Sequence, residues 1–286
     1  MGGSPPFWFT ALAATAIFTV MLSLGLLLGP EQVAAALRRR AVLAAIILGV
    51  VVPIPALAVG LVTLMGIEGP IRLGIVLMSV SPGAPLALRR AIDAGGHARF
   101  APALHLAIVL LAIITVPASI EILNEVFGVS FEISALDVGR QVFFSQVLPI
   151  GLGALILAYR PELAARIEPP LEKLSNVLFL SLVGACVYFL GGPLIRIGWV
   201  PTLAGMGLTA LALAIGSACA GRDTDARPPA AVAAAMRNPG LALLIANLNN
   251  SAPAVAAVVF GYALGAAVIV FAYVAWQVRS RRAIVH

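Results

Sequence analysis

The stretch that decides the fold is "AVAAAMRNPGLALLIANL", residues 231–248. It is apolar enough to cross a bilayer, yet it contains the permanently charged Arg237 and, shortly after it, Pro239 and Gly240. Proline removes a backbone donor and disfavours helix in the residue before it, so we expect a helix interrupted at Asn238. A charge near the bilayer centre costs about 2.5–3.5 kcal/mol on insertion scales. Arg237 therefore needs a physical explanation.

The composition predicts the class of protein. Of 286 residues, 61% are hydrophobic and 10% are charged, whereas soluble domains are nearer one quarter charged. We therefore expect an integral membrane protein. Cys186 and Cys219 form no metal or redox spacing, and we find no nucleophile motif or phosphate-binding loop. We expect no enzyme activity and no cofactor.

Runs of about 20 apolar residues, the length that crosses a hydrocarbon core, predict an all-α polytopic fold. Nine such runs place the two termini on opposite sides of the membrane. The expected spans are 7–28, 41–64, 71–94, 100–120, 139–159, 174–191, 200–219, 229–248 and 254–278.

The basic residues support this topology. With the N-terminus outside, 14 of the 18 fall in connections on the inner side: residues 38–40, Arg89, Arg90, Arg99, Arg160, Arg166, Lys173, Arg222, Arg227, Arg279, Arg281 and Arg282. The outer side holds Arg72, Arg140 and Arg196, and its long loop is acidic. By the positive-inside rule we expect an inner-membrane protein with a periplasmic N-terminus and a cytoplasmic C-terminus. The basic excess follows from this topology, so we expect no nucleic acid partner.

A second span also contains helix breakers at its centre. The third span reads "SVSPGAPLALRRA", residues 79–91, with Pro82, Gly83 and Pro85 near its middle. The third and eighth spans are five apart, so they cross the membrane in opposite directions. Paired breaks of this kind are typical of an inverted repeat whose unwound backbone lines a substrate site. Free N–H groups where each second half-helix begins would favour an anion there.

These segments resemble a known family. "RNPGLALLIA", residues 237–246, looks like the broken-helix motif of the bile acid:sodium symporter (BASS) family, and residues 79–91 are similar to its partner motif. Residues 22–57 resemble the family's second and third helices, and "FSQVLPIGLGALI", residues 144–156, resembles its sixth. The resemblance implies a core domain with crossed helices, a panel domain, and alternating access for organic anions.

The sequence departs from the family pattern at the residues that hold sodium. The resemblance implies ten helices, whereas the chain begins at what resembles the second, and the Ser-Asn pair expected after the first break falls near Leu86 and Ala87. The family's glutamate before its second break falls on Ala233, and its glutamine falls on Arg237. The acidic residues lie at span ends or in loops. We therefore expect the usual sodium coupling to be absent.

Two interpretations of Arg237 stay open. A structural arginine would cap carbonyls freed by the broken helix or extend toward the cytoplasmic side. A functional arginine would supply the positive charge that sodium supplies in relatives, and would steady the crossing or pair with an anionic substrate.

Further candidates lie at the two breaks. We expect substrate binding at Arg237, Asn238, Pro239, Ser79, Ser81, Pro82 and Gly83. The two serines could instead bond their own backbone. His105, in the fourth span, could relay protons or simply pack between helices.

The sequence thus predicts one transporter domain over residues 1–286. Its core-type helices include 71–120 and 229–278, and its panel-type helices include 7–64 and 174–191. We expect a monomer that moves a small or amphipathic organic anion. A membrane receptor or scaffold that keeps the fold without transporting is the alternative.

Overall fold

A computed structural model describes residues 7–85, 90–91, 94 and 100–285. The described elements are all helices, as the sequence predicts. They are α1 (Phe7–Gly25), α2 (Pro30–Arg38), α3 (Arg40–Val51), α4 (Pro53–Leu64), α5 (Gly69–Ser79), α7 (Ala101–Phe127), α8 (Ala135–Val142), the π-helix η1 (Phe143–Val147), α9 (Leu148–Tyr159), α10 (Pro161–Ile197), α11 (Val200–Cys219), α12 (Arg227–Ala235), α13 (Pro239–Leu248) and α14 (Ala252–Val285).

The helix lengths fit a polytopic membrane protein. Within the described residues, eight segments are long and apolar enough to span a bilayer: Phe7–Gly25, Arg40–Leu64, Ala101–Phe127, Ala135–Tyr159, Pro161–Ile197, Val200–Cys219, Arg227–Leu248 and Val255–Ser280. The expected third span begins with the shorter apolar helix Gly69–Ser79. Much of its second half, including Leu86 and Ala87, lies outside the described residues. The count of nine spans and the inverted repeat stay predictions.

The connection before residue 174 is helical, contrary to expectation. Helix α10 begins at Pro161 and runs for 37 residues, so Arg166 and Lys173 lie on a helix instead of in a loop. Proline is favoured in the first turn of a helix, where its missing N–H is not needed. A helix of this length reaches about 55 Å at 1.5 Å per residue, well beyond a hydrocarbon core of about 30 Å.

Prolines also bend two of the spans. The second span divides into α3 and α4 at Val52, directly before Pro53. The fifth span contains the π-helix η1, in which Leu148 N–H bonds to Phe143 O one residue before Pro149. A proline ring clashes with the carbonyl four residues earlier, and widening the preceding turn relieves that clash. The interruption at Val52 and the wide turn of η1 both change which residues of these spans face the interior of the bundle.

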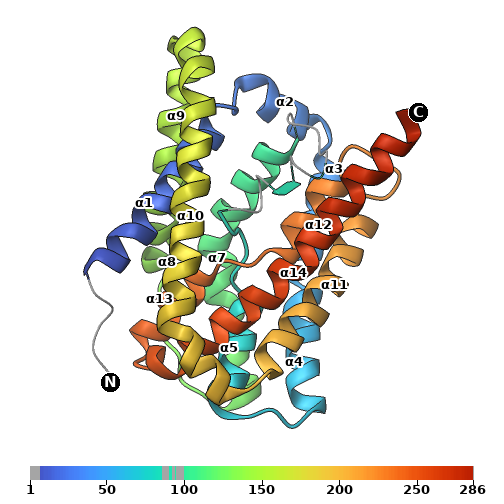
Figure 1. Cartoon of the computed structure of the whole chain (residues 1–286). Coiled ribbons are helices and arrows are strands. Elements are labelled where there is room, and N and C mark those ends of the chain that lie inside the picture. Colours follow the sequence, from blue (N-terminus) through green and yellow to red (C-terminus); the bar gives the residue numbers. More distant parts are fainter. Residues whose placement is uncertain (1–6, 86–89, 92–93, 95–99, 286) are drawn as a thin grey trace.

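The helices pack in two neighbouring groups (Figure 1). Helix α1 packs along α9 and α10, and a Cβ added at Gly25 would collide with Ile150 O. This is the close backbone approach that small residues permit in membrane bundles. Helix α11 packs along α12 and α14, and α3 packs against α11. The single domain and its division into core and panel helices stay predictions.

Hydrogen bonds join connections at each end of the bundle. At one end, Arg39 Nη1 donates to both carboxylate oxygens of Asp223, at 3.0 and 2.9 Å. At the other end, Asn249 Oδ1 accepts from Glu132 N–H at 2.8 Å, and Asn249 Nδ2 donates to Glu132 O at 3.0 Å. Each bond joins two connections that the expected topology places on one side of the membrane.

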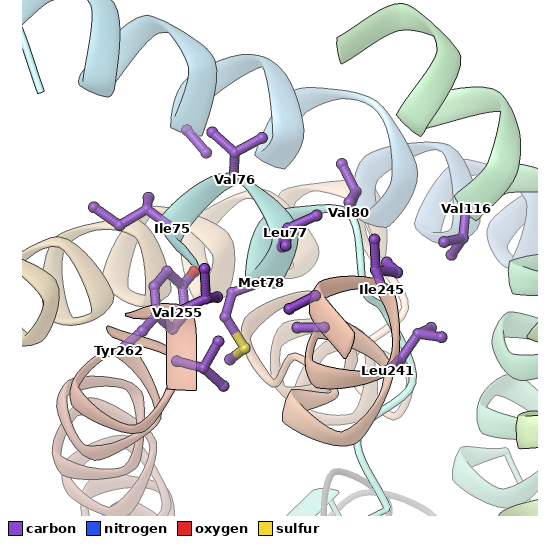
Figure 2. Packing of buried hydrophobic residues seen from close by; sticks show 14 of the residues in the cluster. Ile75, Val76, Leu77, Met78, Val80, Val116, Leu241, Ile245, Val255 and Tyr262 are labelled. Atoms are coloured by element: carbon purple, nitrogen blue, oxygen red, sulfur yellow. The ribbon is translucent and has the colours of Figure 1, made fainter. Parts of the chain in front are cut away.

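A buried apolar cluster holds the two short half-helices in place. Figure 2 shows Leu77 and Met78 of α5 on the side of α13, and Ile75 on the side of Val255 and Tyr262. Val116 from α7 and Val255 and Tyr262 from α14 belong to the same cluster. Packing of this kind, rather than local propensity, provides most of the stability of short helices. The cluster therefore fixes the helix ends that meet at the candidate site.

Candidate functional site

The two predicted interruptions are both present. Helix α5 ends at Ser79, and the backbone over residues 81–84 is not helical. Helix α12 ends at Ala235, Met236 and Asn238 are extended, and α13 begins at Pro239. Pro239 thus occupies the first position of a helix, where its ring is compatible with helical geometry.

Asn238 ties the two breaks together. Its backbone N–H donates to Ser81 O at 2.8 Å, and its Nδ2 donates to Gly83 O at 3.3 Å. Its Oδ1 accepts from Leu241 N–H at 3.2 Å, which caps α13. This cap uses one of the N–H groups that we expected to face an anion. Asn238 therefore has a structural role at the crossing.

The first break is shaped by its backbone. Gly83 has φ +78°, a conformation that costs an L-residue energy, and an added Cβ would lie 2.8 Å from Val109 Cγ1. Ser79 and Ser81 are fully buried, and their hydroxyls donate to Val76 O and Leu77 O, each at 2.7 Å. The serines thus bond their own helix, which was the alternative interpretation.

Arg237 is buried at the crossing, with 4% of its surface exposed. Its Nη2 donates to Val50 O at 3.0 Å, whereas Nε and Nη1 are buried without a partner. Among the described residues, no carboxylate forms an ion pair with it. A guanidinium has five N–H donors on two forked edges, and one bond occupies one of them. Nη2 has two hydrogens, one on each forked edge. Whichever of them bonds Val50 O, the other edge keeps two free N–H donors for an acceptor.

Arg237 borders a narrow space of about 170 Å³. The space is lined by Val51, Pro55, Ser79, Val80, Pro82, Thr115, Ser119 and Arg237. It has no free room for a water molecule, so the helices must move apart to admit a ligand. Thr115 Oγ1 is buried without a partner, and Ser119 Oγ donates to Thr115 O at 2.7 Å. The site therefore combines one positive charge with hydroxyl groups and apolar walls.

The position that the resemblance aligns with a sodium-binding glutamate carries a methyl group. Ala233 is buried in the apolar cluster that contains Leu104 and Ile108, and its methyl group offers no oxygen ligand. Hard cations take oxygen ligands, and carboxylates strengthen such sites. Arg237 follows Ala233 closely in the sequence and carries a positive charge.

Three parts of the site were not predicted from the sequence. The carbonyl of Val50 lies just before the bend at Pro53, and that proline was a detectable signal. Thr115 and Ser119, four residues apart, lie on one face of α7, but an apolar span gives no sign of which face is internal.

These features define a helical membrane protein in which two interrupted helices cross at a buried cation. A family model described as the sodium bile acid symporter family matches residues 14–195. The chain therefore belongs to this family of transporters. The matched region includes the first break but not the second, which contains Arg237. A search among curated proteins finds no match to the chain.

Proposed function

We propose that the protein is a secondary transporter of organic anions that works by alternating access. The observation that carries this proposal is the open fork of Arg237, a buried cation with Nε and Nη1 unpartnered at the crossing. Leaving charged donors unsatisfied in a low-dielectric interior is costly, whereas a carboxylate can satisfy two of them at once. An anionic substrate would supply that partner.

The proposed substrate is a small monoanion with polar groups near the charge. Among the described residues that line the space, Arg237 is the one basic residue, and Ser79, Thr115 and Ser119 also line it. The free Thr115 Oγ1 can bond a substrate oxygen. Val80 and Pro82 also line the space and add apolar surface.

The proposed transport cycle does not use the family's usual sodium site. Ala233 stands where the resemblance implies a carboxylate, and Arg237 adds a fixed positive charge close to it in sequence. We propose that the charge of Arg237 stabilises the bound anion in place of the positive charge that sodium supplies in relatives. The protein would act as a monomer in the bilayer, without a cofactor.

We also propose an inner-membrane location with the N-terminus in the periplasm. The basic connections carry this orientation, and the contact between Arg39 and Asp223 supports a common side for two of them. A cysteine at Ser4 should react with an impermeant thiol reagent in intact cells, and one at Arg281 should not. The reverse labelling pattern would contradict the orientation.

Uptake by proteoliposomes tests the transport proposal. Purified protein would be reconstituted and supplied with labelled pyruvate, lactate, gluconate or taurocholate. We expect saturable uptake of one or more small acids and weaker uptake of taurocholate, because a cation beside hydroxyl-bearing residues suits a compact polar acid better than a large apolar one. Saturable binding without flux would support a receptor instead. The absence of both binding and flux for all four anions would overturn the proposed function.

A further inference from the structure

A second polar contact lies inside the bundle, between α7 and the π-helix. His105 Nε2 lies 3.1 Å from Gln146 Oε1, and these side chains are 3% and 0% exposed. The contact joins α7 to the span Ala135–Tyr159, whose α8 part packs along α7 and whose α9 part packs along α1. Polar groups inside membrane bundles are costly and commonly mark ion or proton pathways.

The π-helix explains why Gln146 points inward. Phe143 and Phe144, at the start of η1, are 47% and 64% exposed, whereas Gln146 is fully buried. The wide turn before Pro149 changes the helical phase, so that a polar side chain faces the bundle within an otherwise apolar span. Single π-turns occur often at functional sites. Gln146 Nε2 is buried without a partner, so the site has an unused donor.

His105 has no charged partner among the described residues. Its hydrogen bond is to Gln146, and the charged residues of the helices packed against α7 make no ion pair with it. These residues, together with the acids of α7 itself, are Glu31, Arg38, Arg40, Glu121, Glu125, Asp137, Arg140 and Arg227. A neutral imidazole suits such surroundings while Arg237 already carries a positive charge.

We propose that His105 is the proton-binding group that couples anion transport to a proton gradient, which rests on the proposed function above. The amide oxygen of Gln146 can only accept, so Nε2 donates to it and Nδ1 is the nitrogen that takes the proton. The imidazolium keeps the same bond to Gln146. The proton reaches Nδ1 from the outer solution and leaves to the inner one.

The charge balance links the two sites. Without substrate, protonation of His105 adds a second buried positive charge to that of Arg237. A bound monoanion cancels the charge of Arg237, so protonation becomes easier. By reciprocity, a protonated His105 strengthens anion binding to the same extent. One anion and one proton then cross together, and no net charge moves.

Proteoliposomes under an imposed pH gradient test this coupling. The probe is whichever of pyruvate, lactate or gluconate the parent protein takes up, with the membrane potential clamped by potassium and valinomycin. An acidic outer solution should accumulate the probe about tenfold per pH unit. His105→Gln keeps a donor for Gln146 but cannot titrate, so it should still exchange probe across the membrane without gradient-driven accumulation.

Matched variants and outcomes separate the two proposals. His286→Gln removes a different histidine and should behave like the parent. Asp93→Asn tests an acid outside the described residues, and it should keep the gradient response. Saturable uptake that ignores the gradient, or a gradient response that survives in His105→Gln, would overturn the proton proposal alone. No saturable uptake of any probe by the parent would overturn the proposed function and this inference with it.

Discussion

The two broken helices share a sequence signature but differ in chemistry. Both interruptions contain a proline beside a glycine, at Pro82 and Gly83 in the first and at Pro239 and Gly240 in the second. At the first break, the neighbouring hydroxyls bond their own helix and the backbone takes a conformation that suits glycine. At the second, Arg237 lies buried with unused donors.

The prolines therefore determine where the helices are interrupted, whereas Arg237 determines the charge of the site. Proline interrupts each helix, but the residues beside it decide what the interruption can bind. The first break supplies acceptor carbonyls to Asn238, which fixes the crossing. The second supplies the cation that an anion can approach. Substitutions at the first break should therefore affect stability, whereas those at Arg237 should affect binding.

The largest effect is expected from Arg237→Ala. Losing the charge-assisted fork should weaken anion binding at least a hundredfold, about 3 kcal/mol, while the protein stays folded. Arg237→Lys should recover only part, because an ammonium has no planar fork with which to hold a carboxylate while it also bonds Val50 O. Equilibrium binding of the transported probe, measured on purified protein, gives both values.

The matched control for this change is Arg196→Ala. Arg196 is exposed in the last turn of α10, so its removal should leave affinity unchanged. If Arg237→Ala binds and transports like the parent, the arginine is structural, and its bond to Val50 is then its main role.

Asn238→Ala should have the next largest effect, on stability. The change removes the cap of α13 and the bond to Gly83 O, which together contribute about 2 kcal/mol. Asn238→Ser keeps a cap oxygen without burying a carboxylate opposite Gly83 O, and it should lose about half as much. Thermal unfolding of the detergent-solubilised protein measures the difference, and equal melting temperatures for both variants would mean that the cap contributes nothing.

Gly83→Ala should destabilise the first break by about 1–2 kcal/mol. The methyl group would meet Val109 Cγ1 at 2.8 Å, and the backbone would have to keep φ at +78°. Gly184→Ala is the control, since its added Cβ meets nothing within 4 Å and alanine favours helix. The two changes should shift the melting temperature in opposite directions. A Gly83→Ala protein as stable as the parent would contradict the requirement for glycine there.

Much of this architecture could be predicted from sequence, because hydrophobic length and proline position are local signals. The membrane class, the interruptions and the buried position of Arg237 follow from them. The helical extension from Pro161 could not be predicted, because charged residues made this stretch resemble a loop although their helix propensity is good. Tertiary contacts, including the bond from Arg237 to Val50 O, could not be predicted from the sequence either.

The serines and Asn238 show where local reasoning was weakest. Ser79 and Ser81 were candidates for substrate contact, yet their hydroxyls bond the preceding turn. Asn238 was expected to be a polar group at the break, and it also joins the two segments. Sequence identifies which polar atoms lie near a break, but only three-dimensional packing decides which of them keep unused donors.

The smallest effect is expected from replacing sodium. This experiment tests whether the charge at the second break takes the place of a bound cation. Replacing sodium with potassium or choline should leave binding and uptake by the parent unchanged, because the methyl of Ala233 offers no ligand and Arg237 repels a cation. The double change Ala233→Glu with Arg237→Gln brings back a carboxylate, removes that repulsion and restores the family's pattern at both positions. It should convert the absent sodium response into a measurable one, although the introduced carboxylate would enter an apolar cluster and lower stability. Arg237→Gln alone is the control, since it removes the repulsion without adding an oxygen anion. A steep sodium dependence in the parent itself would mean that carbonyls and hydroxyls suffice to hold the ion, and that the charge of Arg237 does not replace it.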